Sequence, residues 1–351
     1  MIYKAYVGTY SVRGSKGIYL IEADMEMGIL KILDTWPAVS PSYLAISNGI
    51  LYAALECGEF EGVSGGGVAS YAIGQDGSLS LLSAKPTHGR SPCHVCPAPN
   101  GKTLFVSNFG DGKLSVFDVR NGVLGYGVLI VHSGRGPNVA RQKGPHVHCA
   151  QFEPVIPAGD LQGQSSHPGV GRLCVVDLGI DRAIFYKTAD MSASGSCFAT
   201  EGGAGPRHVV FAQRKPYAWV ICELSNEVYA FERVGGKRLG VYPTLPGDFT
   251  GQSSCAAIKL SPDERRLYAS NRGHDSIACF DIDEKTGALT LIAIRSTGGR
   301  TPRDFAISPD GLFLFAANQD SDKIRVFRLE NGAPVDTGLS LDIPSPVCVL
   351  M

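Results

Sequence analysis

The sequence predicts an all-β protein, a seven-bladed β-propeller made of four-stranded antiparallel blades. Three observations predict this fold. One sequence unit recurs along the whole chain, as it does in proteins built from repeated structural elements. Each unit holds about four short strand-like runs, and 43 glycines and 21 prolines supply turn residues throughout. We expect residues 1–351 to form a single propeller domain.

The repeating unit opens with a proline or a small residue and continues as an apolar strand, a turn and a second strand of the form L-Y/F-x-x-N. Two copies show it well: SPCHVCPAPNGKTLFVSNFGDGKLSVFDV and TPRDFAISPDGLFLFAANQDSDKIRVFRL. Successive units start roughly 40 to 60 residues apart, which is the range of propeller blades. The seven starts lie at Pro41, Pro92, Pro145, Pro206, Cys255, Pro302 and Pro346.

Both ends of the chain are expected to contribute to one blade. The seventh unit, SPVCVLM, holds only one strand, and the first residues supply the pieces that it lacks. YKAYVGTYS is predicted to be a second strand, KGIYLIEAD a third and GILKILDTW a fourth. A blade assembled from N-terminal strands and the C-terminal strand closes the ring and removes exposed sheet edges.

The charge and the apolar pattern exclude two classes of partner. The formal net charge is -1, the pI is near 6.7 and no arginine-lysine run occurs, so no nucleic acid is expected. The chain begins with a strand-like alternation, MIYKAYVGTYS, and no later segment has the apolar length of a membrane span. We therefore expect no membrane association and a cytoplasmic location, while self-association stays open.

The ten cysteines are expected to be reduced thiols. Cys93 and Cys96 form a C-x-x-C, but no second pair follows at zinc spacing and no βαβ pattern surrounds them. Five others lie in apolar strand-like runs, where a free cysteine behaves as a small buried hydrophobe. These are Cys174, Cys222, Cys255, Cys279 and Cys348.

Short stretches spread in order over the whole chain resemble a known family. Among them are YVGTYS, SKGIY, PCHV, GPNVARQKGPHVH, DLGIDR, GPRHVVF, ELSNEVYAF and PRDFAISPDG. The family is that of the seven-bladed propeller lactonases, typified by cycloisomerase-2-type 6-phosphogluconolactonase and including fungal carboxy-cis,cis-muconate cyclase. The resemblance implies a metal-independent enzyme, and we expect no cofactor. Two features depart from the family: Ala257 stands where its glutamate is expected, and the turn at 154–172 is expanded.

One position in the first strand of each unit is predicted to face the central channel. When the units are aligned by the proline, or the equivalent residue, of the turn after that strand, the residue six positions earlier forms a column. The first strand is the innermost of its blade, so this column lines the channel. Its members are Cys93, His148, Arg207, Ala256 and Arg303, with Ser42 and Val347 added by analogy.

A second column comes from the ends of the second strands. First and second strands run antiparallel, so the start of one lies beside the end of the other. Strand ends such as ICEL and ASNR therefore place further polar residues at the same mouth of the channel. These residues are Glu56, Asn108, Asp177, Glu223, Arg272 and Gln319.

Some of these polar residues have a structural explanation. Strand-end Asn and Asp side chains commonly satisfy turn backbones, and we expect that role for Asn108, Asn271, Asn318 and Asp177. Several arginines at one narrow mouth repel one another unless acids or an anionic ligand compensate. We therefore expect a pocket for an anion at this mouth.

Two histidines follow a Gly-Pro on alternate residues. His148 falls in the channel column, whereas His146 belongs to the preceding loop, with Arg141 and Gln142 as candidate contacts at the rim. No metal site is expected, because the chain has no H-E-x-x-H or calcium-loop pattern and the two histidines lack visible companion ligands. The expanded turn at 154–172 joins a first to a second strand and is expected at the opposite rim.

The resemblance implies hydrolysis of a sugar lactone, and the expected reaction is that of 6-phosphoglucono-δ-lactone to 6-phosphogluconate, a step of the pentose phosphate pathway. Guanidinium groups bind phosphate and stabilise an oxyanion, while a neutral imidazole or a carboxylate activates water. The general base is expected to be His148 or Glu223. The substrate-binding residues are expected to be Arg207, Arg272, Arg303, Gln319, Arg141 and Glu56.

Other interpretations remain open. Arginines also bind carboxylates, so a cycloisomerase or lactonase acting on a carboxylated lactone such as a muconolactone is an alternative. A non-catalytic binding module fits the missing glutamate at Ala257, although the G-H and W-D signature of such propellers is absent. A nucleophilic Cys93 has no visible activating partner. His208 follows Arg207 on a strand and is expected to point the opposite way, in a structural role.

Overall fold

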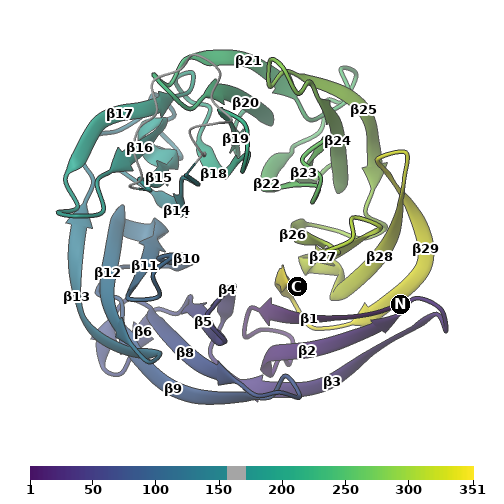
Figure 1. Cartoon of the computed structure of the whole chain (residues 1–351), viewed down its shortest axis with the longest axis horizontal. Helices are drawn as coiled ribbons and strands as arrows, with labels where there is room; N and C mark the ends of the chain where they lie inside the picture. Colours follow the sequence, from purple (N-terminus) through teal and green to yellow (C-terminus); the bar gives the residue numbers. More distant parts are fainter. Residues whose placement is uncertain (156–170) are drawn as a thin grey trace.

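Seven four-stranded antiparallel sheets form a ring around a central channel in the computed structural model (Figure 1). The structure describes residues 1–155 and 171–351. The predicted all-β, seven-bladed fold is confirmed. No helix in these two ranges is long and apolar enough to span a membrane. Single 3₁₀ turns follow three of the second strands: η1 (Phe109–Asp111), η3 (Leu178–Ile180) and η4 (Gln319–Ser321).

Each sheet runs from an inner strand at the channel to an outer strand at the perimeter. A short hairpin of β6 (Glu59–Phe60) and β7 (Val63–Ser64) lies apart from the blades. In each blade the strands are named from the inside outward. The blade that joins the chain ends consists of β30 (Pro346–Leu350), β1 (Ile2–Thr9), β2 (Gly17–Asp24) and β3 (Ile29–Pro37), and the next two consist of β4 (Pro41–Ser47), β5 (Ile50–Leu55), β8 (Gly67–Ile73) and β9 (Leu79–Pro86), and of β10 (Pro92–Pro97), β11 (Thr103–Asn108), β12 (Lys113–Arg120) and β13 (Val123–Val131). The remaining four consist of β14 (Val147–Phe152), β15 (Leu173–Asp177), β16 (Arg182–Tyr186) and β17 (Ala193–Ala199); β18 (Pro206–Phe211), β19 (Tyr217–Cys222), β20 (Glu227–Glu232) and β21 (Arg238–Pro243); β22 (Ser254–Leu260), β23 (Arg266–Arg272), β24 (Ser276–Ile282) and β25 (Leu289–Ser296); and β26 (Pro302–Ile307), β27 (Phe313–Asn318), β28 (Lys323–Glu330) and β29 (Ala333–Asp342).

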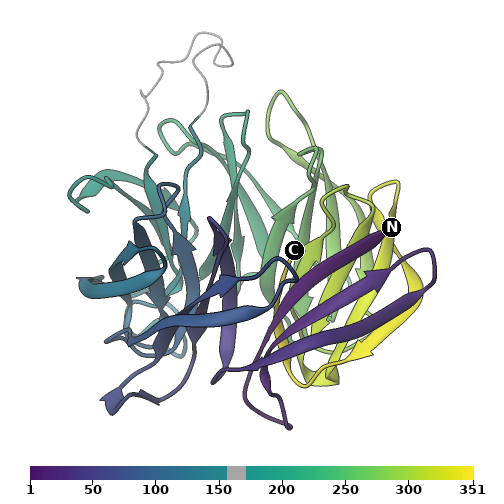
Figure 2. The same ribbon diagram turned by 60° about the horizontal axis from the view of Figure 1, so that its bottom comes forward.

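One blade combines the two ends of the chain, as predicted. The C-terminal strand β30 pairs antiparallel with β1, with Val7 opposite Val349. Figure 2 shows the N-terminal strands lying against the C-terminal blade. This pairing closes the ring, because the two ends of the chain together complete the seventh four-stranded sheet.

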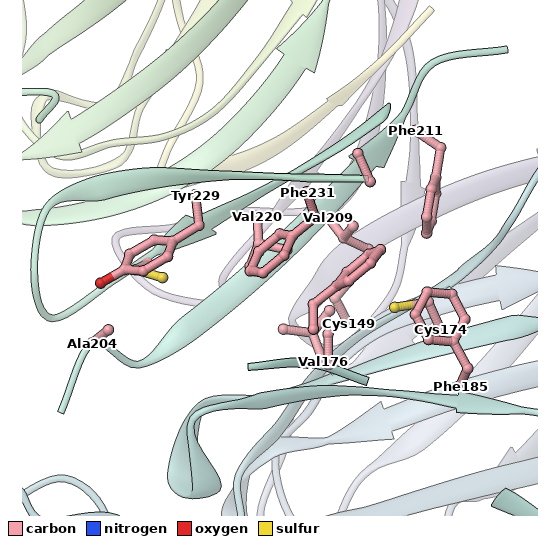
Figure 3. Packing of buried hydrophobic residues seen from close by; sticks show 14 residues of the cluster. Cys149, Cys174, Val176, Phe185, Ala204, Val209, Phe211, Val220, Tyr229 and Phe231 are labelled. Atoms are coloured by element: carbon pink, nitrogen blue, oxygen red, sulfur yellow. The ribbon is translucent and has the colours of Figure 1, made fainter. Parts of the chain in front are cut away.

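The hydrophobic core lies between the blades. In one cluster, residues of β14 to β17 pack against residues of β18 to β20 (Figure 3). The ring of Phe198 contacts Phe185 at a centroid distance of 4.9 Å and Phe231 at 4.6 Å. Each such fully buried side chain contributes about 1.5–3 kcal/mol. This packing fixes the spacing of the inner strands, and hence of the side chains that they direct into the channel.

Each inner strand is interrupted by a β-bulge near its start. In β18, Pro206 pairs with Cys222 and His208 pairs with Ile221, so Arg207 has no partner on β19. A bulge inserts one extra residue into a strand and changes the direction in which nearby side chains point. We call the extra residues the bulge row: Ser42, Cys93, His148, Arg207, Ala256, Arg303 and Val347.

The bulge row has the same members as the channel column predicted from the sequence. In β22 the extra residue is shared between Ala256 and Ala257, which together face Ser270. The next residue of each inner strand forms a second row, which lies further along the strand. The second row consists of Tyr43, His94, Cys149, His208, Ala257, Asp304 and Cys348.

The expanded turn between β14 and β15 falls largely on residues 156–170, so its predicted position at the opposite rim lies outside the described residues. The ladder continues one pair beyond the two strands, because the backbone N–H of Glu153 donates to the carbonyl of Arg172 at 2.9 Å. The side chains of the same two residues form an ion pair at 2.7 Å.

Candidate active site

Glu223 is the centre of an ion-pair cluster at one mouth of the channel. Its Oε1 accepts a hydrogen bond from Nη2 of Arg141 at 2.5 Å. Its Oε2 lies 2.9 Å from Nη2 of Arg272 and 3.2 Å from Nε of Arg207. Arg207 belongs to the bulge row, Glu223 directly follows β19 and Arg272 ends β23. Two neighbouring blades and a rim loop therefore bring together four residues that the sequence predicted for one pocket.

The three arginines suppress the basicity of Glu223. Burial alone would raise the pKa of this carboxyl, but the charges of Arg272 and Arg207 outweigh burial and hold the pKa well below its usual range. Both carboxylate oxygens are also engaged by guanidinium groups. A carboxylate in this state is a poor general base. Its position suits it instead to hold the arginines in place.

His148 is the second candidate base, and its environment keeps it neutral. Its side chain is buried, and its Nδ1 lies 3.7 Å from Sγ of Cys93. Burial, and then the charge of Arg207, lower the pKa of His148 well below the usual value. Nε2 of the ring has no hydrogen-bond partner among the residues that the structure describes. The lowered pKa weakens this imidazole as a base as well, but its Nε2 is free to accept a proton from water, whereas both oxygens of Glu223 are engaged by guanidinium groups.

Arg303 brings a further positive charge into the bulge row. Its Cζ lies 5.3 Å from the ring centroid of Tyr10, whose hydroxyl donates to Oε2 of Glu56 at 3.0 Å. Arg303, Glu56, Cys93 and Arg207 line one narrow space. Within 1–155 and 171–351, the Arg303 guanidinium makes neither a hydrogen bond nor an ion pair. It is therefore a cation whose donors are free to bind a ligand.

Tyr10 is a site residue that the sequence did not indicate. It lies at the end of the predicted strand YKAYVGTYS and is not among the predicted site residues. Its contacts with Glu56 and Arg303 come from the pairing of β1 with β30, which brings the end of β1 to the channel mouth. The sequence contained no signal for this contact, because the partners are distant in the chain.

Gln319 is not joined to this cluster. Its Nε2 donates to Oδ1 of Asp320 at 3.1 Å, and its backbone carbonyl accepts a hydrogen bond from Nη2 of Arg13 at 2.6 Å. It begins the short turn η4, and these contacts stabilise the rim.

The strand-end Asn and Asp residues have the structural roles that were predicted. Nδ2 of Asn271 donates to the carbonyl of Thr244 at 3.0 Å, and Nδ2 of Asn108 donates to Oγ of Ser115 at 2.9 Å. Nδ2 of Asn318 likewise donates to the carbonyl of Thr297 at 3.1 Å. Asp177 accepts hydrogen bonds from the backbone N–H groups of His146 and Gly179 and from the ring of His132. All four side chains are fully buried.

Arg141 lies in the loop before β14, at the mouth of the channel, and the buried side chain of Gln142 holds this loop in place. Gln142 is 1% exposed, and its Nε2 donates to Oδ1 of Asp181 at 2.7 Å and to the carbonyl of Leu178 at 2.8 Å. A Cβ at Gly136 would lie 2.3 Å from Oε1 of Gln142, so a larger residue there would force the buried amide of Gln142 to shift. Gln142 is therefore an internal anchor, and the expectation that it contacts the rim was wrong.

His146 has a similar anchoring role. Its Nδ1 donates to the carbonyl of Phe109 at 2.7 Å, and its ring stacks on Phe109 at a centroid distance of 4.5 Å. These contacts tie the loop of Arg141 to η1 of the neighbouring blade. His146 lies in the loop before β14 and His148 in the bulge row, as expected.

His208 does not point away from Arg207, and the prediction that it does was wrong. Nε2 of His208 lies 3.1 Å from Nη1 of Arg207, and its ring lies 5.4 Å from the ring of His148. The prediction assumed the alternation of a regular strand. The bulge at Arg207 removes that alternation, so both side chains face the channel.

Two further positions limit the possible chemistry. Burial raises the pKa of the Cys93 thiol above its usual range, and Glu56 adds to the effect. A thiol in this state is not an activated nucleophile. Ala257 is fully buried in the second row and donates its N–H to Oγ of Ser270 at 2.9 Å. The residue of β22 in contact with the arginine cluster is Ala256, whose carbonyl accepts a hydrogen bond from Nη1 of Arg207 at 2.7 Å.

Histidine, cysteine and acidic residues do not gather as a metal site in the part of the chain that the structure describes. No group of three or more has suitable geometry. The cationic groups of the pocket are the guanidinium groups of Arg141, Arg207, Arg272 and Arg303.

Comparison with known proteins points to one family. Residues 4–351 match the family model of the lactonases, described as seven-bladed β-propellers. The chain is 38% identical to 6-phosphogluconolactonase of Bacillus subtilis over 99% of this chain and 97% of that protein. It is similar in structure to the periplasmic gluconolactonase of Pseudomonas aeruginosa, with a TM-score of 0.88 and 31% identity over 99% and 98% of the two chains. A protein from Lactobacillus plantarum has a TM-score of 0.87 and 30% identity over 100% and 99%.

Proposed function

This chain belongs to the seven-bladed β-propeller lactonase family, and on that premise we propose that it hydrolyses 6-phosphoglucono-δ-lactone to 6-phosphogluconate. The observation that carries the proposal is the free guanidinium of Arg303 in the same row as the neutral imidazole of His148. A lactone hydrolase needs such a pair, because one group must stabilise an oxyanion while another accepts a proton from water.

The charge of the pocket supports a phosphorylated substrate. Four guanidinium groups stand against two carboxylates, Glu223 and Glu56, which leaves an excess of positive charge. Arg141 and Arg272 are nearest the mouth, with 44% and 15% of their side chains exposed. We assign the phosphate to these two arginines, because a guanidinium has five donors and Glu223 uses only some of them.

We assign water activation to His148. Nε2 of its neutral ring accepts a proton as the water oxygen forms a bond to the lactone carbonyl carbon. The carbonyl oxygen becomes an oxyanion, which Arg207 and Arg303 stabilise from the bulge row. When the ring ester bond breaks, the protonated His148 returns the proton to the leaving oxygen. The products are a free hydroxyl group and a carboxylic acid, which releases its proton to solvent and becomes a carboxylate, and His148 is regenerated as the neutral base.

In this scheme Glu223 is a positioning residue. It holds Arg207, Arg272 and Arg141 within ion-pair distance of one another, which their mutual repulsion would otherwise oppose. The burial of Arg207 and its neighbours Arg272 and Arg303 lower the pKa of Arg207 to about 10, and the guanidinium stays charged at neutral pH.

We also place the reaction in the cytoplasm. All ten cysteines are unpaired and eight of them are buried, which suits a reducing compartment. Fractionation of cells that express the protein from its own promoter tests this assignment.

The function is tested with freshly prepared 6-phosphoglucono-δ-lactone, glucono-δ-lactone and a carboxymuconolactone, each corrected for spontaneous opening and assayed with and without chelator. We expect the phosphorylated lactone to be preferred, and chelator to have no effect. Arg303→Met should lower kcat/KM about 100-fold or more. Arg300→Met, a change at an exposed arginine that binds a backbone carbonyl of the rim, is the matched control.

Each outcome separates one part of the proposal from another. If the protein prefers unphosphorylated glucono-δ-lactone, the assignment of a phosphate to Arg141 and Arg272 is wrong, but the proposed lactonase activity is supported. Preference for the carboxymuconolactone would favour the carboxylated substrate, since the same arginines bind carboxylates. No rate above the spontaneous reaction with any lactone would overturn the proposal and favour a binding module.

A further inference from the structure

A second cavity of about 290 Å³ lies beyond the arginine cluster, among the second-row residues. Its walls come from β4, β10, β14, β18 and β22, at positions further along each inner strand than the bulge row. It is therefore displaced along the channel, away from the mouth where Glu223 lies. Its polar lining consists of Tyr43, His94, Cys149, Gln151, His208 and Lys259.

Two side chains separate this cavity from the candidate active site. Tyr43 and His208 line the second cavity and also the narrow space that contains Glu56, Arg207 and Arg303. The ring of Tyr43 packs on His94 at a centroid distance of 4.1 Å and on His208 at 5.9 Å. The aromatic cluster divides the channel into two compartments, each with its own polar groups.

His208 presents a hydrogen-bond donor to the second cavity. Its Nε2 faces Nη1 of Arg207 at 3.1 Å, and an arginine can only donate, so Nε2 is the acceptor. Burial, and then Arg207, lower the pKa of His208 well below the usual value, and the ring is neutral. The hydrogen of a neutral ring must then sit on Nδ1. Nδ1 has no partner in the described part of the chain.

His94 adds a buried nitrogen without a partner. It is 3% exposed, and its Nδ1 makes no hydrogen bond, whereas its Nε2 lies 3.5 Å from Sγ of Cys149. Burial and the charge of Lys259 lower the pKa of His94 to about 3. A buried polar atom without a partner costs about 1–3 kcal/mol, and a bound ligand or water relieves that cost.

Lys259 supplies positive charge to the cavity. Its Nζ lies 3.5 Å from Oδ1 of Asp304, too far for a strong hydrogen bond, while Oδ2 of Asp304 accepts the N–H of Val349 at 3.0 Å. Burial alone would lower the pKa of Lys259, but Asp304 outweighs it and raises the pKa, so the ammonium stays charged. Apart from this ion pair, no polar partner of its ammonium is found within 1–155 and 171–351, so its remaining N–H donors can bind a ligand.

We propose that this cavity binds a small carboxylate, held by the ammonium of Lys259 and by Nδ1–H of His208. The hydroxyl of Tyr43 is a third donor, since it too has no hydrogen bond to a described residue. The cavity volume is at the lower end of the range for ligand sites, which suits a compact molecule. Asp304 offsets part of the charge of Lys259, and this favours a singly charged carboxylate over a phosphate dianion.

The test is a titration of the full-length protein with acetate, followed by NMR of its ¹⁵N-labelled histidine rings. We expect the resonances of His94 and His208, assigned through His94→Gln and His208→Gln, to shift and saturate. Lys259→Met should weaken acetate binding at least tenfold. Lys237→Met removes an exposed lysine before β21 and should leave the affinity unchanged. Inorganic phosphate should shift the same resonances less at equal concentration.

Two variants keep the proposal falsifiable. Tyr43→Phe keeps the ring packing and removes only the hydroxyl, so it tests the cavity if Lys259→Met does not fold; it should weaken binding several-fold. Arg272→Met alters the other compartment and should leave these shifts in place. The proposal is wrong if the shifts are absent or do not saturate, if Lys259 and Tyr43 variants bind acetate like wild type, or if Arg272→Met alone abolishes the shifts.

Discussion

Nη1 of Arg207 lies 3.1 Å from Nε2 of His208, the next residue in the chain. In a regular strand these two side chains would point to opposite faces of the sheet. They meet because Arg207 is the extra residue of a bulge and has no partner on β19. Arg207 can therefore reach Glu223 on one side while its neighbour faces the second cavity on the other.

Replacing His148 with glutamine should remove the general base. We expect kcat to fall about 100-fold to 10,000-fold, with KM little changed, because glutamine cannot accept the proton from water. The control is His88→Asn at an exposed turn residue with φ of 56°, a conformation that asparagine tolerates. Steady-state kinetics on the lactone measure both values, and a kcat near wild type in His148→Gln would rule out the assignment.

Replacing Glu223 with glutamine should destabilise the fold at neutral pH. The pKa of Glu223 is lowered in the folded state, so the carboxylate adds stability above its unfolded pKa, near 4.5, and that stability is lost as the pH falls towards the folded pKa. Removing one partner of a buried ion pair costs about 3–5 kcal/mol. The melting temperatures of the two proteins should therefore differ most at neutral pH and converge in acid. A gap that stays constant with pH would contradict this.

Glu223→Gln also distinguishes the two candidate bases. If Glu223 positions arginines, the variant should raise KM because the phosphate contacts loosen, and His148 should still titrate in the pH profile of kcat. Loss of kcat alone, with KM unchanged, would instead assign proton transfer to Glu223.

Replacing Gln142 with alanine should act through Arg141. Gln142 is buried and fixes the loop by its bonds to Asp181 and Leu178, so its loss should free Arg141 from the pocket. We expect KM to rise to about the value of Arg141→Ala, with kcat retained. The double variant should show little further change, because the two residues act as one unit. Gln213→Ala, at an exposed glutamine, is the control; additive effects of the first two changes would reject the model.

Replacing Cys93 with serine should leave most of the activity. The Cys93 thiol has a raised pKa and is buried, so it is neither a nucleophile nor a target for alkylation. We expect iodoacetamide to leave the lactonase rate of native protein unchanged. Inactivation by this reagent that Cys93→Ser abolishes would show that the thiol takes part in the reaction.

The repeat predicted the ring and much of the candidate site. Aligning the units by the proline of one turn, or by the equivalent residue where the proline is missing, selected Arg207, His148 and Arg303, because that turn position keeps a constant distance from the bulge in these blades. The bulge itself is a property of two paired strands, so the spacing within one strand could not reveal it. This is why His208 was assigned to the wrong face.

Other contacts depend on the closed ring and could not be read from local sequence. Tyr10 meets Arg303 only because β1 pairs with β30. Gln142 was expected at the rim because it neighbours Arg141, yet a buried carboxylate, Asp181, turns it inward. Both errors concern residues whose partners are far away in the chain.

The bulge row has a consequence for how new activities can evolve on this scaffold. Its members have no ladder partner, so a substitution there leaves the pairing of the surrounding strands largely undisturbed. The row already holds residues as different as Ser42, Cys93, His148 and Arg207 at equivalent positions of successive blades. Single substitutions in the bulge row can therefore change the substrate preference during evolution, while the strand pairing of the blades is retained.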